Sequence, residues 1–393
     1  MSDIAPKRIA VIGSPGRIDG ALRKPIPELM KRVSHNTGNL ASWYAIDRHV
    51  AAKKTYFGWD FDPEQIRNEF DVVIFAESIQ LNPDWDLGNL ARRLEATQKP
   101  LVVLGLGVQL DDFDEPPQLS PGTQRLISLF GERCVRVGML GDFSASVAVK
   151  YGARNVEVIG CPSNFINTWH TDLGVRIARR LVGTRKPYRL AVNLDLNLQL
   201  ATTIRRCVSW LQEWGGYLVV QTSISPIHLA LGQADRVPPE ELRYLSNLLF
   251  DSEWDESIRQ FLSSQLAVFF DAEAWMSAIR PSRLSIGTRL QGNILAFQAG
   301  VPSIVITHDS RTKELADTIA FPTVTEYEIL EAKSLPDLIS GIEFDGAAYD
   351  LRRRALARRY IDILTASDLP VSADILSFAL KTESTARLLA PAE

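Results

Sequence analysis

The sequence predicts an α/β protein made of two doubly wound, Rossmann-like domains that face a cleft, followed by C-terminal helices. Three observations favour this fold class. Apolar runs typical of buried strands alternate with helical patterns along most of the chain. The length of 393 residues suits two domains of ordinary size better than one. After Phe321–Val324 the pattern becomes helical, with no further strand.

The N-terminal α/β domain is expected to span residues 1–170. Its first strand is Ile9–Ile12, which runs into a Gly/Pro turn. Asp71–Glu77 and Pro100–Gln109 are apolar without alternation, which is typical of strands buried on both faces of a parallel sheet. The remaining elements of this domain are expected to be helices at about 86–97, 121–131 and 142–151 and strands at 134–137 and 156–159.

The second α/β domain is expected to span residues 171–335. A polar, basic and helix-like segment at about 169–187 is interpreted as the linker between the domains. The alternation then resumes, with strands at 189–194, 217–222 and 266–270, helices at 202–214 and up to 278, and two amphipathic helices between 239 and 264.

The second domain ends in the block around which the chain is organised, beginning with the short strand Leu284–Ile286 and a turn at Gly287. Thr288 is predicted to cap the following helix, with Gln291 as its partner in a capping box. Gly300 suits the left-handed position after this helix. The helix shows one apolar face, formed by Leu290, Ile294 and Phe297.

A second strand, Ser303–Thr307, releases His308–Arg311 into a polar loop before another helix. The carboxyl ends of parallel strands meet at one edge of a sheet, so this loop and Arg289 are expected to lie close together. A helix N-terminus attracts anions, and the planar guanidinium of Arg289 matches a carboxylate or phosphate. The block therefore predicts an anion site.

Residues 336–393 are expected to form helices at Ala347–Leu364 and Val371–Leu389 that pack back on the two domains. The first helix contains the arginine-rich run Leu351–Arg359. A solvated helix face is the favoured interpretation of this run, and peripheral contact with an anionic membrane surface is the alternative.

Composition excludes several classes of partner. The formal net charge is −4 without a dense basic run, so no nucleic acid is expected. Three cysteines without a CxxC pair suit a reducing compartment. No apolar run is long enough to cross a membrane and no signal sequence precedes the first strand, so a cytoplasmic location is expected. The acidic segment Asp111–Glu115 lacks a calcium-loop spacing, so we expect a solvated loop and no metal site.

Three runs in the block resemble the signature of the polysaccharide pyruvyl transferase family: Gly287–Asn293, Ala299–Pro302 and His308–Leu315. The resemblance is thinner over the rest of the chain, including the end of the first domain at about 136–163. It implies two domains of the GT-B type, with the acceptor on the first domain and the donor on the second.

The family reaction moves a pyruvyl ketal from phosphoenolpyruvate to a sugar of a cell-surface polysaccharide or its precursor. It needs a proton for the methylene carbon of the donor, cations around its carboxylate and phosphate, and a base for the sugar hydroxyl. The resemblance makes Arg289 and Arg311 the anion clamps. It implies no cofactor beyond phosphoenolpyruvate as donor substrate.

One position departs from the family pattern, because Gln291 stands where the family has a histidine that serves as the acid. In one interpretation Gln291 only caps the helix, and the acid is His308 at the neighbouring strand end. In the other, the pyruvyl chemistry is lost.

Further residues are expected to bind substrate. In the first domain, Asn39 lies where the family has an element rich in Asn and Gly, Glu77 and Gly107 follow strands, and Asn164 lies in the segment that closes the domain. The expected substrate-binding residues of the second domain are Gly287, Thr288, Asn293, Asp309, Ser310 and Arg311.

Two other functions stay open at this point. A GT-B glycosyltransferase would hold the diphosphate of a nucleotide sugar with Gly287, Arg289 and Arg311, and would use Asp309 or Glu77 as base. A non-catalytic relative would keep the anion and sugar pocket without turnover, and the departure at Gln291 favours it.

Overall fold

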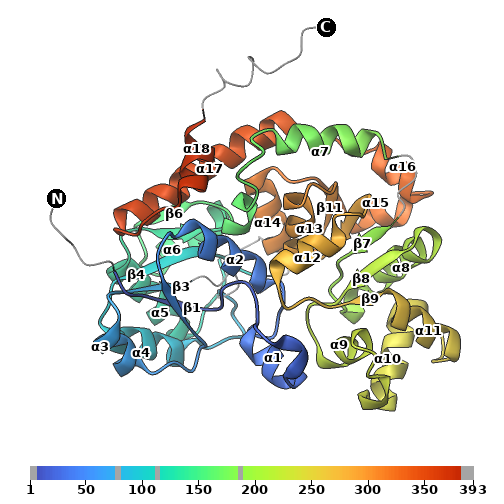
Figure 1. Cartoon of the computed structure of the whole chain (residues 1–393), viewed down its shortest axis with the longest axis horizontal. Helices are drawn as coiled ribbons and strands as arrows, with labels where there is room; N and C mark the ends of the chain where they lie inside the picture. The colour runs from blue at the N-terminus through green and yellow to red at the C-terminus, as the bar shows by residue number, and fades with distance from the viewer. Residues whose placement is uncertain (1–6, 76–80, 111–115, 185–188, 382–393) are drawn as a thin grey trace, which may run out of the picture.

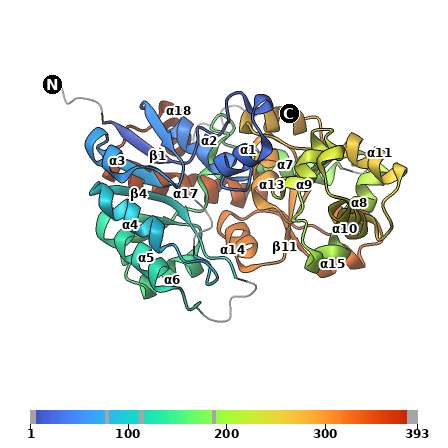
Figure 2. The same cartoon turned by 90° about the horizontal axis from the view of Figure 1, so that it is seen from below.

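The computed structural model describes residues 7–75, 81–110, 116–184 and 189–381. Within these residues the chain forms two six-stranded parallel sheets, in the orders β2-β1-β3-β4-β5-β6 and β12-β11-β10-β7-β8-β9. Figures 1 and 2 show the two sheets side by side, each covered by helices. The predicted fold class, two doubly wound domains of the GT-B type with C-terminal helices, is confirmed.

In the part of the chain that the structure describes, each sheet consists of six short strands. The first sheet consists of β1 Ile9–Ile12, β2 Lys54–Phe57, β3 Val72–Phe75, β4 Leu101–Leu106, β5 Val137–Met139 and β6 Val156–Val158. The second consists of β7 Leu190–Val192, β8 Gly216–Val219, β9 Leu266–Ala267, β10 Leu284–Gly287, β11 Ser303–Thr307 and β12 Thr323–Thr325.

Helices connect the strands on both faces of each sheet. Those of the first domain are α1 Ile26–Arg32, α2 Asn39–His49, α3 Pro63–Glu69, α4 Gly88–Thr97, α5 Pro121–Arg133 and α6 Asp142–Lys150. Those of the second are α7 Leu173–Val182, α8 Ala201–Trp214, α9 Ile224–Ala230, α10 Pro239–Phe250, α11 Glu256–Gln265, α12 Ala272–Ile279, α13 Leu290–Gln298, α14 Ser310–Ile319, α15 Glu326–Glu331 and α16 Leu335–Ser340. The chain continues into α17 Gly346–Ala366 and α18 Ala373–Leu380.

Two edge strands, β2 and β12, were not predicted from the sequence. Central strands such as β3 and β4 are buried throughout and therefore continuously apolar. The edge strand β2 has no fully buried residue, and β12 has only Val324 buried. A strand with one solvated edge needs no continuous apolar run, so its pattern is weak.

The expected linker contains a regular helix, because α7 packs along α17 (Figure 1). The two helices approach closely at two glycines: a Cβ atom on Gly174 would lie 2.3 Å from the carbonyl oxygen of Gly346. At its other end α17 contacts β4, β5 and β6, so it spans both domains. The second C-terminal helix is seen to Leu380, and most of its predicted extension to Leu389 lies outside the described residues.

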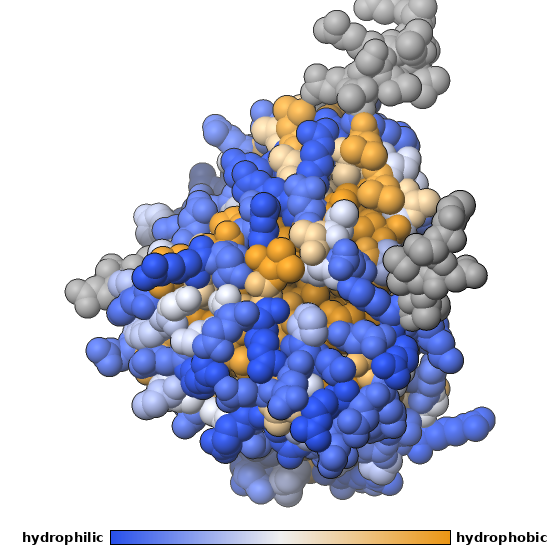
Figure 3. Space-filling view, turned by 90° about the vertical axis from the view of Figure 1, so that its left-hand side faces the viewer, coloured by the Kyte–Doolittle hydropathy of each residue, from blue (hydrophilic) through white to orange (hydrophobic). Residues whose placement is uncertain are grey.

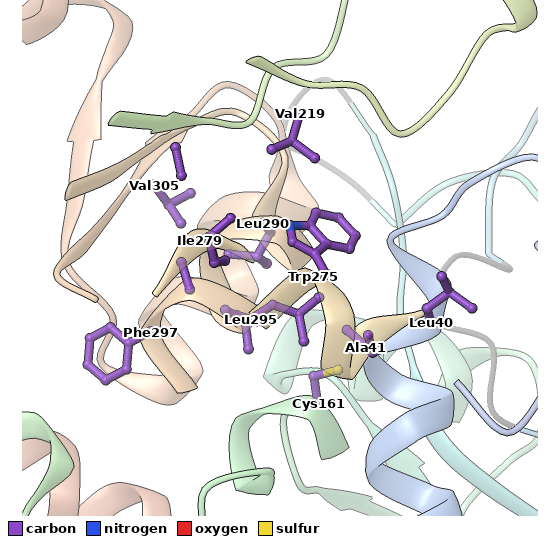
Figure 4. Close-up of a cluster of buried hydrophobic side chains, with 14 of the residues drawn as sticks. Leu40, Ala41, Cys161, Val219, Trp275, Ile279, Leu290, Leu295, Phe297 and Val305 are labelled. Carbon is purple, nitrogen blue, oxygen red and sulfur yellow. The ribbon is translucent and has the colours of Figure 1, made fainter. Parts of the chain in front are cut away.

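The larger hydrophobic core is shared by the two domains. Leu40 and Ala41 of α2 lie against the cluster formed by Trp275 of α12 and by Leu290 and Leu295 of α13 (Figure 4). These side chains are at most 2% exposed. The interface between the domains is therefore partly apolar, and α2 is fixed to the second domain.

The arginine-rich run on α17 is largely used in internal contacts. Arg353 is fully buried, and Arg354 and Arg358 donate hydrogen bonds to the carbonyl oxygens of Thr171 and Ala379. The expected solvated helix face therefore describes only part of this run. Figure 3 shows a mainly hydrophilic left-hand face of the molecule, with apolar side chains gathered in its upper and middle parts. Across the part of the chain that the structure describes, no helix has both the length and the apolar character to span a bilayer.

Candidate active site in the cleft between the domains

A cleft of about 900 Å³ separates the two sheets at the carboxyl ends of their strands. The second domain contributes Asp195, Thr222 and Arg289 to its lining. The first domain contributes Glu28, Lys31, Arg32, Ser34, His35, Asn36, Asn39, Gly58, Trp59, Asp60, Trp85 and Gln109. This position agrees with the general preference of ligands for the carboxyl ends of parallel strands.

Arg289 is the cation of the second domain in this cleft. Its Nη2 donates hydrogen bonds to Asp195 Oδ1 at 2.6 Å and to Thr222 Oγ1 at 3.1 Å. Its Nε is buried and has no hydrogen-bond partner among the described residues. An unsatisfied buried N–H is costly, so a ligand oxygen that accepts from it would be stabilised.

The predicted capping box of Thr288 and Gln291 is wrong. Arg289 stays extended, with φ −86° and ψ 100°, so α13 begins at Leu290 and has no side-chain cap. Thr288 Oγ1 instead accepts from the backbone N–H of Asp195 at 2.7 Å. Because the helix begins at Leu290 and not directly after Thr288, the Thr288 side chain is not in the capping position.

Gln291 is directed away from the cleft. Its Oε1 accepts from Ser163 Oγ at 3.1 Å and its Nε2 lies 3.5 Å from Cys161 Sγ, both in the first domain. The side chain is buried, and it is not among the residues that line the cleft. Gln291 therefore joins the two domains.

Two residues that were expected to bind substrate, Gly287 and Asn293, instead shape the turn before α13. Gly287 has φ 152°, and a Cβ atom there would lie 1.9 Å from the carbonyl oxygen of Asn193. Asn293 is fully buried, and its Nδ2 donates to the carbonyl oxygens of Gly287 and Arg289 at 2.9 and 3.2 Å. The structure thus places both residues behind the cleft surface, where they hold Arg289 in position.

His308 and Asp309 lie in a second layer, behind Gln109. Asp309 Oδ1 accepts from the backbone N–H of Thr312 at 2.7 Å and caps α14, and its Oδ2 accepts from Gln109 Nε2 at 3.2 Å. His308 Nε2 lies 3.7 Å from the same Oδ2. Only Gln109 of this chain of contacts lines the cleft.

The two residues that follow connect α14 to the first domain. Ser310 exchanges two hydrogen bonds of 3.0 Å with the backbone of Leu110. Arg311 is buried, and its desolvation lowers its pKa, an effect that Asp309 opposes. Arg311 interacts electrostatically with Arg289, although it is not part of the cleft lining.

The residues predicted in the first domain are dispersed. Asn39 lines the cleft, and its Nδ2 donates to the carbonyl oxygen of Val33 at 3.0 Å. The carbonyl oxygen of Gly107 accepts from the N–H of Leu81. Asn164 is fully buried beside α17, where its Oδ1 accepts from Tyr349 at 2.6 Å. Glu77 and Asp111–Glu115 lie outside the described residues.

Three residues of the cleft with aromatic side chains were not predicted from the sequence: His35, Trp59 and Trp85. Ser34 and His35 both have left-handed backbones, with φ 49° and 60°, and the N–H of His35 donates to the carbonyl oxygen of Met30 at 2.7 Å. Two such residues in succession cost free energy, and this kind of strain is concentrated at functional sites. The signal in the sequence was the run His35-Asn-Thr-Gly-Asn, which had suggested only Asn39.

Cations and carboxylates are matched in the cleft. Lys31 pairs with Asp60 at 2.8 Å, and Arg289 pairs with Asp195. Arg32 and Glu28, both also in the lining, form a third pair at 3.0 Å. Among the described lining residues, a ligand would therefore meet individual donors and acceptors and no broad field of one sign.

The sequence model of the polysaccharide pyruvyl transferase family matches residues 30–310, which include the lining from Lys31 to Arg289. The chain belongs to the polysaccharide pyruvyl transferase family. The predicted family is thereby confirmed. No curated protein matches the chain.

Solved structures resemble this pyruvyl transferase family member in overall fold only. S. aureus MnaA with UDP shares 11% identity over 92% of this chain and 98% of its own, with a TM-score of 0.43. Anabaena HepE in complex with UDP and glucose shares 14% over 99% and 100%, with a TM-score of 0.44. The UDP-N-acetylglucosamine 2-epimerase of Rickettsia bellii shares 10% over 92% and 97%, with a TM-score of 0.44. Likenesses this distant say nothing about the ligand of the chain.

Proposed function

We propose that this protein transfers the pyruvyl group of phosphoenolpyruvate to a sugar of a cell-surface polysaccharide or its precursor, in the cytoplasm. The observation that carries the proposal is Arg289, which the family motif marks as an anion ligand. It lines the cleft, and its Nε–H has no hydrogen-bond partner among the described residues. The uncapped first turn of α13 follows it directly and adds the positive end of a helix dipole.

In this proposal the donor binds at the second-domain side of the cleft. One carboxylate or phosphate oxygen accepts from Arg289 Nε, while Thr222 and Asp195 keep the guanidinium in its plane. Arg311 behind it adds a positive charge at longer range. The proposal keeps the anion site expected from the sequence but changes the role of Arg311. Arg311 attracts the anion at a distance and does not contact it directly.

In this proposal the acceptor sugar binds to the first domain. Trp85 is 44% exposed and Trp59 is half-buried, and both line the cleft. Indole faces offer flat apolar surface to the C–H face of a sugar ring, and the nearby Asn36 and Gln109 amides supply donors and acceptors for its hydroxyls.

The chemistry needs one proton on carbon. The methylene carbon of the donor gains a proton, and the neighbouring carbon forms two C–O bonds to sugar hydroxyls as the bond to phosphate breaks. The two hydroxyls release two protons, of which one replaces the proton given by the acid and one leaves with phosphate. A histidine suits this exchange near neutral pH.

Two histidines are candidates for this acid now that Gln291 is known to face away from the cleft. The role predicted for His308 stays a prediction, and this side chain would act through Asp309 and Gln109. His35 lines the cleft itself, so a substrate can contact it directly. We therefore assign the proton donor to His35.

Thermal unfolding with phosphoenolpyruvate, compared with a panel of nucleotide sugars, tests the donor. A ligand at one hundred times its dissociation constant stabilises a protein by about 2.7 kcal/mol. We expect phosphoenolpyruvate to raise the melting temperature of the wild type and of Arg32→Ala, which loses another cleft cation, but not of Arg289→Ala. A shift with nucleotide sugars alone would overturn the proposal in favour of a glycosyltransferase.

One observation favours a second candidate function, a binding protein without turnover. The position of the family's acid is occupied by Gln291, a buried residue that binds Ser163. Release of inorganic phosphate from phosphoenolpyruvate in the presence of acceptor oligosaccharides separates the two. Binding of the donor without any phosphate release across the panel would support the binding protein.

A further inference from the structure

A second groove lies at the opposite end of α13, over the connecting segment at residues 166–172, which we call the hinge. It encloses about 690 Å³ and is lined by Trp169 and His170 of the connecting segment, by α7, by Arg280 at the end of α12 and by the last residues of α13. Helix α13 has nine residues and spans roughly 13 Å at 1.5 Å per residue, so the groove is separate from the cleft.

The charges in this groove are not matched. Its described lining residues include four arginines, Arg176, Arg179, Arg180 and Arg280, and no carboxylate. Arg176 pairs with Asp172 outside the lining, at 2.9 Å. Among the described residues, neither Arg179 nor Arg280 takes part in an ion pair.

The remaining arginine of the lining, Arg180, lies near another cation. Arg180 donates to the carbonyl oxygen of Gly300 at the end of α13. Partial burial lowers its pKa, and the like charge of the nearby Arg283 lowers it further. Arginines near the ends of α7 and α12 complement the dipoles of those helices. The helix dipoles explain why arginines lie near these helix ends. They do not explain why the arginines of both helices line the same groove.

An exposed aromatic ring adjoins the cations. Trp169 is 58% exposed, although tryptophan is usually mostly buried. Its neighbour His170 is held to the hinge, because Asn167 Oδ1 accepts from the backbone N–H of His170 at 3.0 Å. Asn167 in turn binds Gln298 of α13 through two hydrogen bonds of 2.9 Å. The ring is therefore carried by a segment fixed to the floor of the groove.

We propose that this groove is a binding site for a soluble organic phosphate, held by Arg179, Arg180 and Arg280 with its ring against Trp169. Guanidinium groups bind phosphate through paired, charge-assisted hydrogen bonds, and a flat ring stacks on indole. The bound phosphate supplies the negative charge that the lining lacks. Because the ligand bridges the connecting segment and α12, it also fastens the hinge to the second domain.

Calorimetric titration of the full chain with inorganic pyrophosphate tests the phosphate site. We expect Arg179→Ala/Arg280→Ala to weaken binding at least tenfold. The matched control Arg154→Ala/Arg243→Ala removes two exposed arginines that line neither the cleft nor the groove, and it should bind like the wild type. Arg289→Ala, which alters the cleft, should retain the binding. Equal weakening in both double variants, or loss only in Arg289→Ala, would overturn the proposal.

Trp169→Ala tests the organic part of the ligand and leaves every arginine in place. In the Arg289→Ala background we expect this substitution to weaken adenosine monophosphate several-fold and to leave pyrophosphate unchanged. An equal effect on both probes, or on neither, contradicts the role of the ring.

Phosphatidylglycerol vesicles offer the same phosphate chemistry from a lipid. Cosedimentation that depends on Arg179 and Arg280, without binding of either soluble probe, would overturn the soluble source and assign the groove to a membrane headgroup.

Discussion

The two sides of the contact between the domains differ in how their polar atoms are used. On the cleft side, the buried Nε–H of Arg289 has no partner within the part of the chain that the structure describes, and His35 has a left-handed backbone. On the hinge side, the guanidinium of Arg353 donates to the carbonyl oxygens of Asn164, Asn167 and His170. Arg289 therefore has a donor left for a ligand, whereas the guanidinium of Arg353 is used for the stability of the contact between the domains.

The largest effect is expected on the cleft side, for His35→Ala. Loss of a general acid typically costs roughly 10²- to 10⁴-fold in rate. Phosphate release from phosphoenolpyruvate should fall in this range, while the melting temperature changes little, because the side chain is exposed. His308→Ala is the control. If His308→Ala shows the larger loss and His35→Ala remains active, the acid is His308, as the sequence had predicted.

The next largest effect is expected on the hinge side, for Arg353→Met. Methionine fills much of the volume but leaves several buried carbonyl oxygens without a donor, and breaking such an arrangement costs about 3–5 kcal/mol. Chemical denaturation should show this loss. The rate of phosphate release per folded molecule should be close to that of the wild type. A variant that is stable but has lost this activity would contradict the assignment of Arg353 to stability.

Gln291→Ala probes a residue between the two sides. Removing the side chain leaves the Ser163 hydroxyl without this acceptor, which costs about 1–3 kcal/mol. We expect lower stability and an unchanged response to phosphoenolpyruvate in thermal unfolding. A lost response would show that Gln291 reaches the donor after all.

The smallest effect concerns pH and Asp350, which accepts from the backbone N–H groups of Gly174 and Val175 at 2.7 and 3.1 Å. Burial raises the pKa of this carboxyl from 3.8 to about 6. The folded state then holds the proton more tightly, so this group's contribution to stability is present below pH 3.8 and is lost as the pH rises through about 6.

The melting temperature should be measured as a function of pH between pH 3.8 and about 6. Asp350→Asn should remove the part of the fall in melting temperature that Asp350 causes in the wild type. Asparagine keeps one acceptor oxygen for α7, so the variant should fold. An unchanged slope would assign the pH dependence to other groups, among them Glu314, whose pKa burial also raises.

The fold was predictable because the central strands are continuously apolar, as in β3 and β4. The edge strands β2 and β12 were not, because they lack such a run. The family motif includes Arg289, which lines the cleft, and its role as an anion ligand stays a prediction. It could not show that Asn293 and Arg311, in the same motif, are buried behind the cleft surface, because burial depends on how the second sheet packs against the first.

The first-domain half of the cleft was the harder part to predict. Trp59, Trp85 and His35 lie in connecting segments far apart in the sequence, and only the packing of the elements brings them together. The capping box failed for a local reason, since Thr-x-x-Gln spacing says nothing about the extended backbone of Arg289. Spacing predicts which residues share an element, and long-range packing decides what they face.

The apolar contact of α2 with α12 and α13 has a consequence for how the protein loses its structure. Separating the two sheets would expose Leu40, Ala41, Trp275 and Leu295 to water, and burial of apolar surface is worth about 25 cal/mol per Å². Neither half can melt without breaking the core of the other. Two domains by architecture should therefore behave as one cooperative unit in calorimetry, with a single transition.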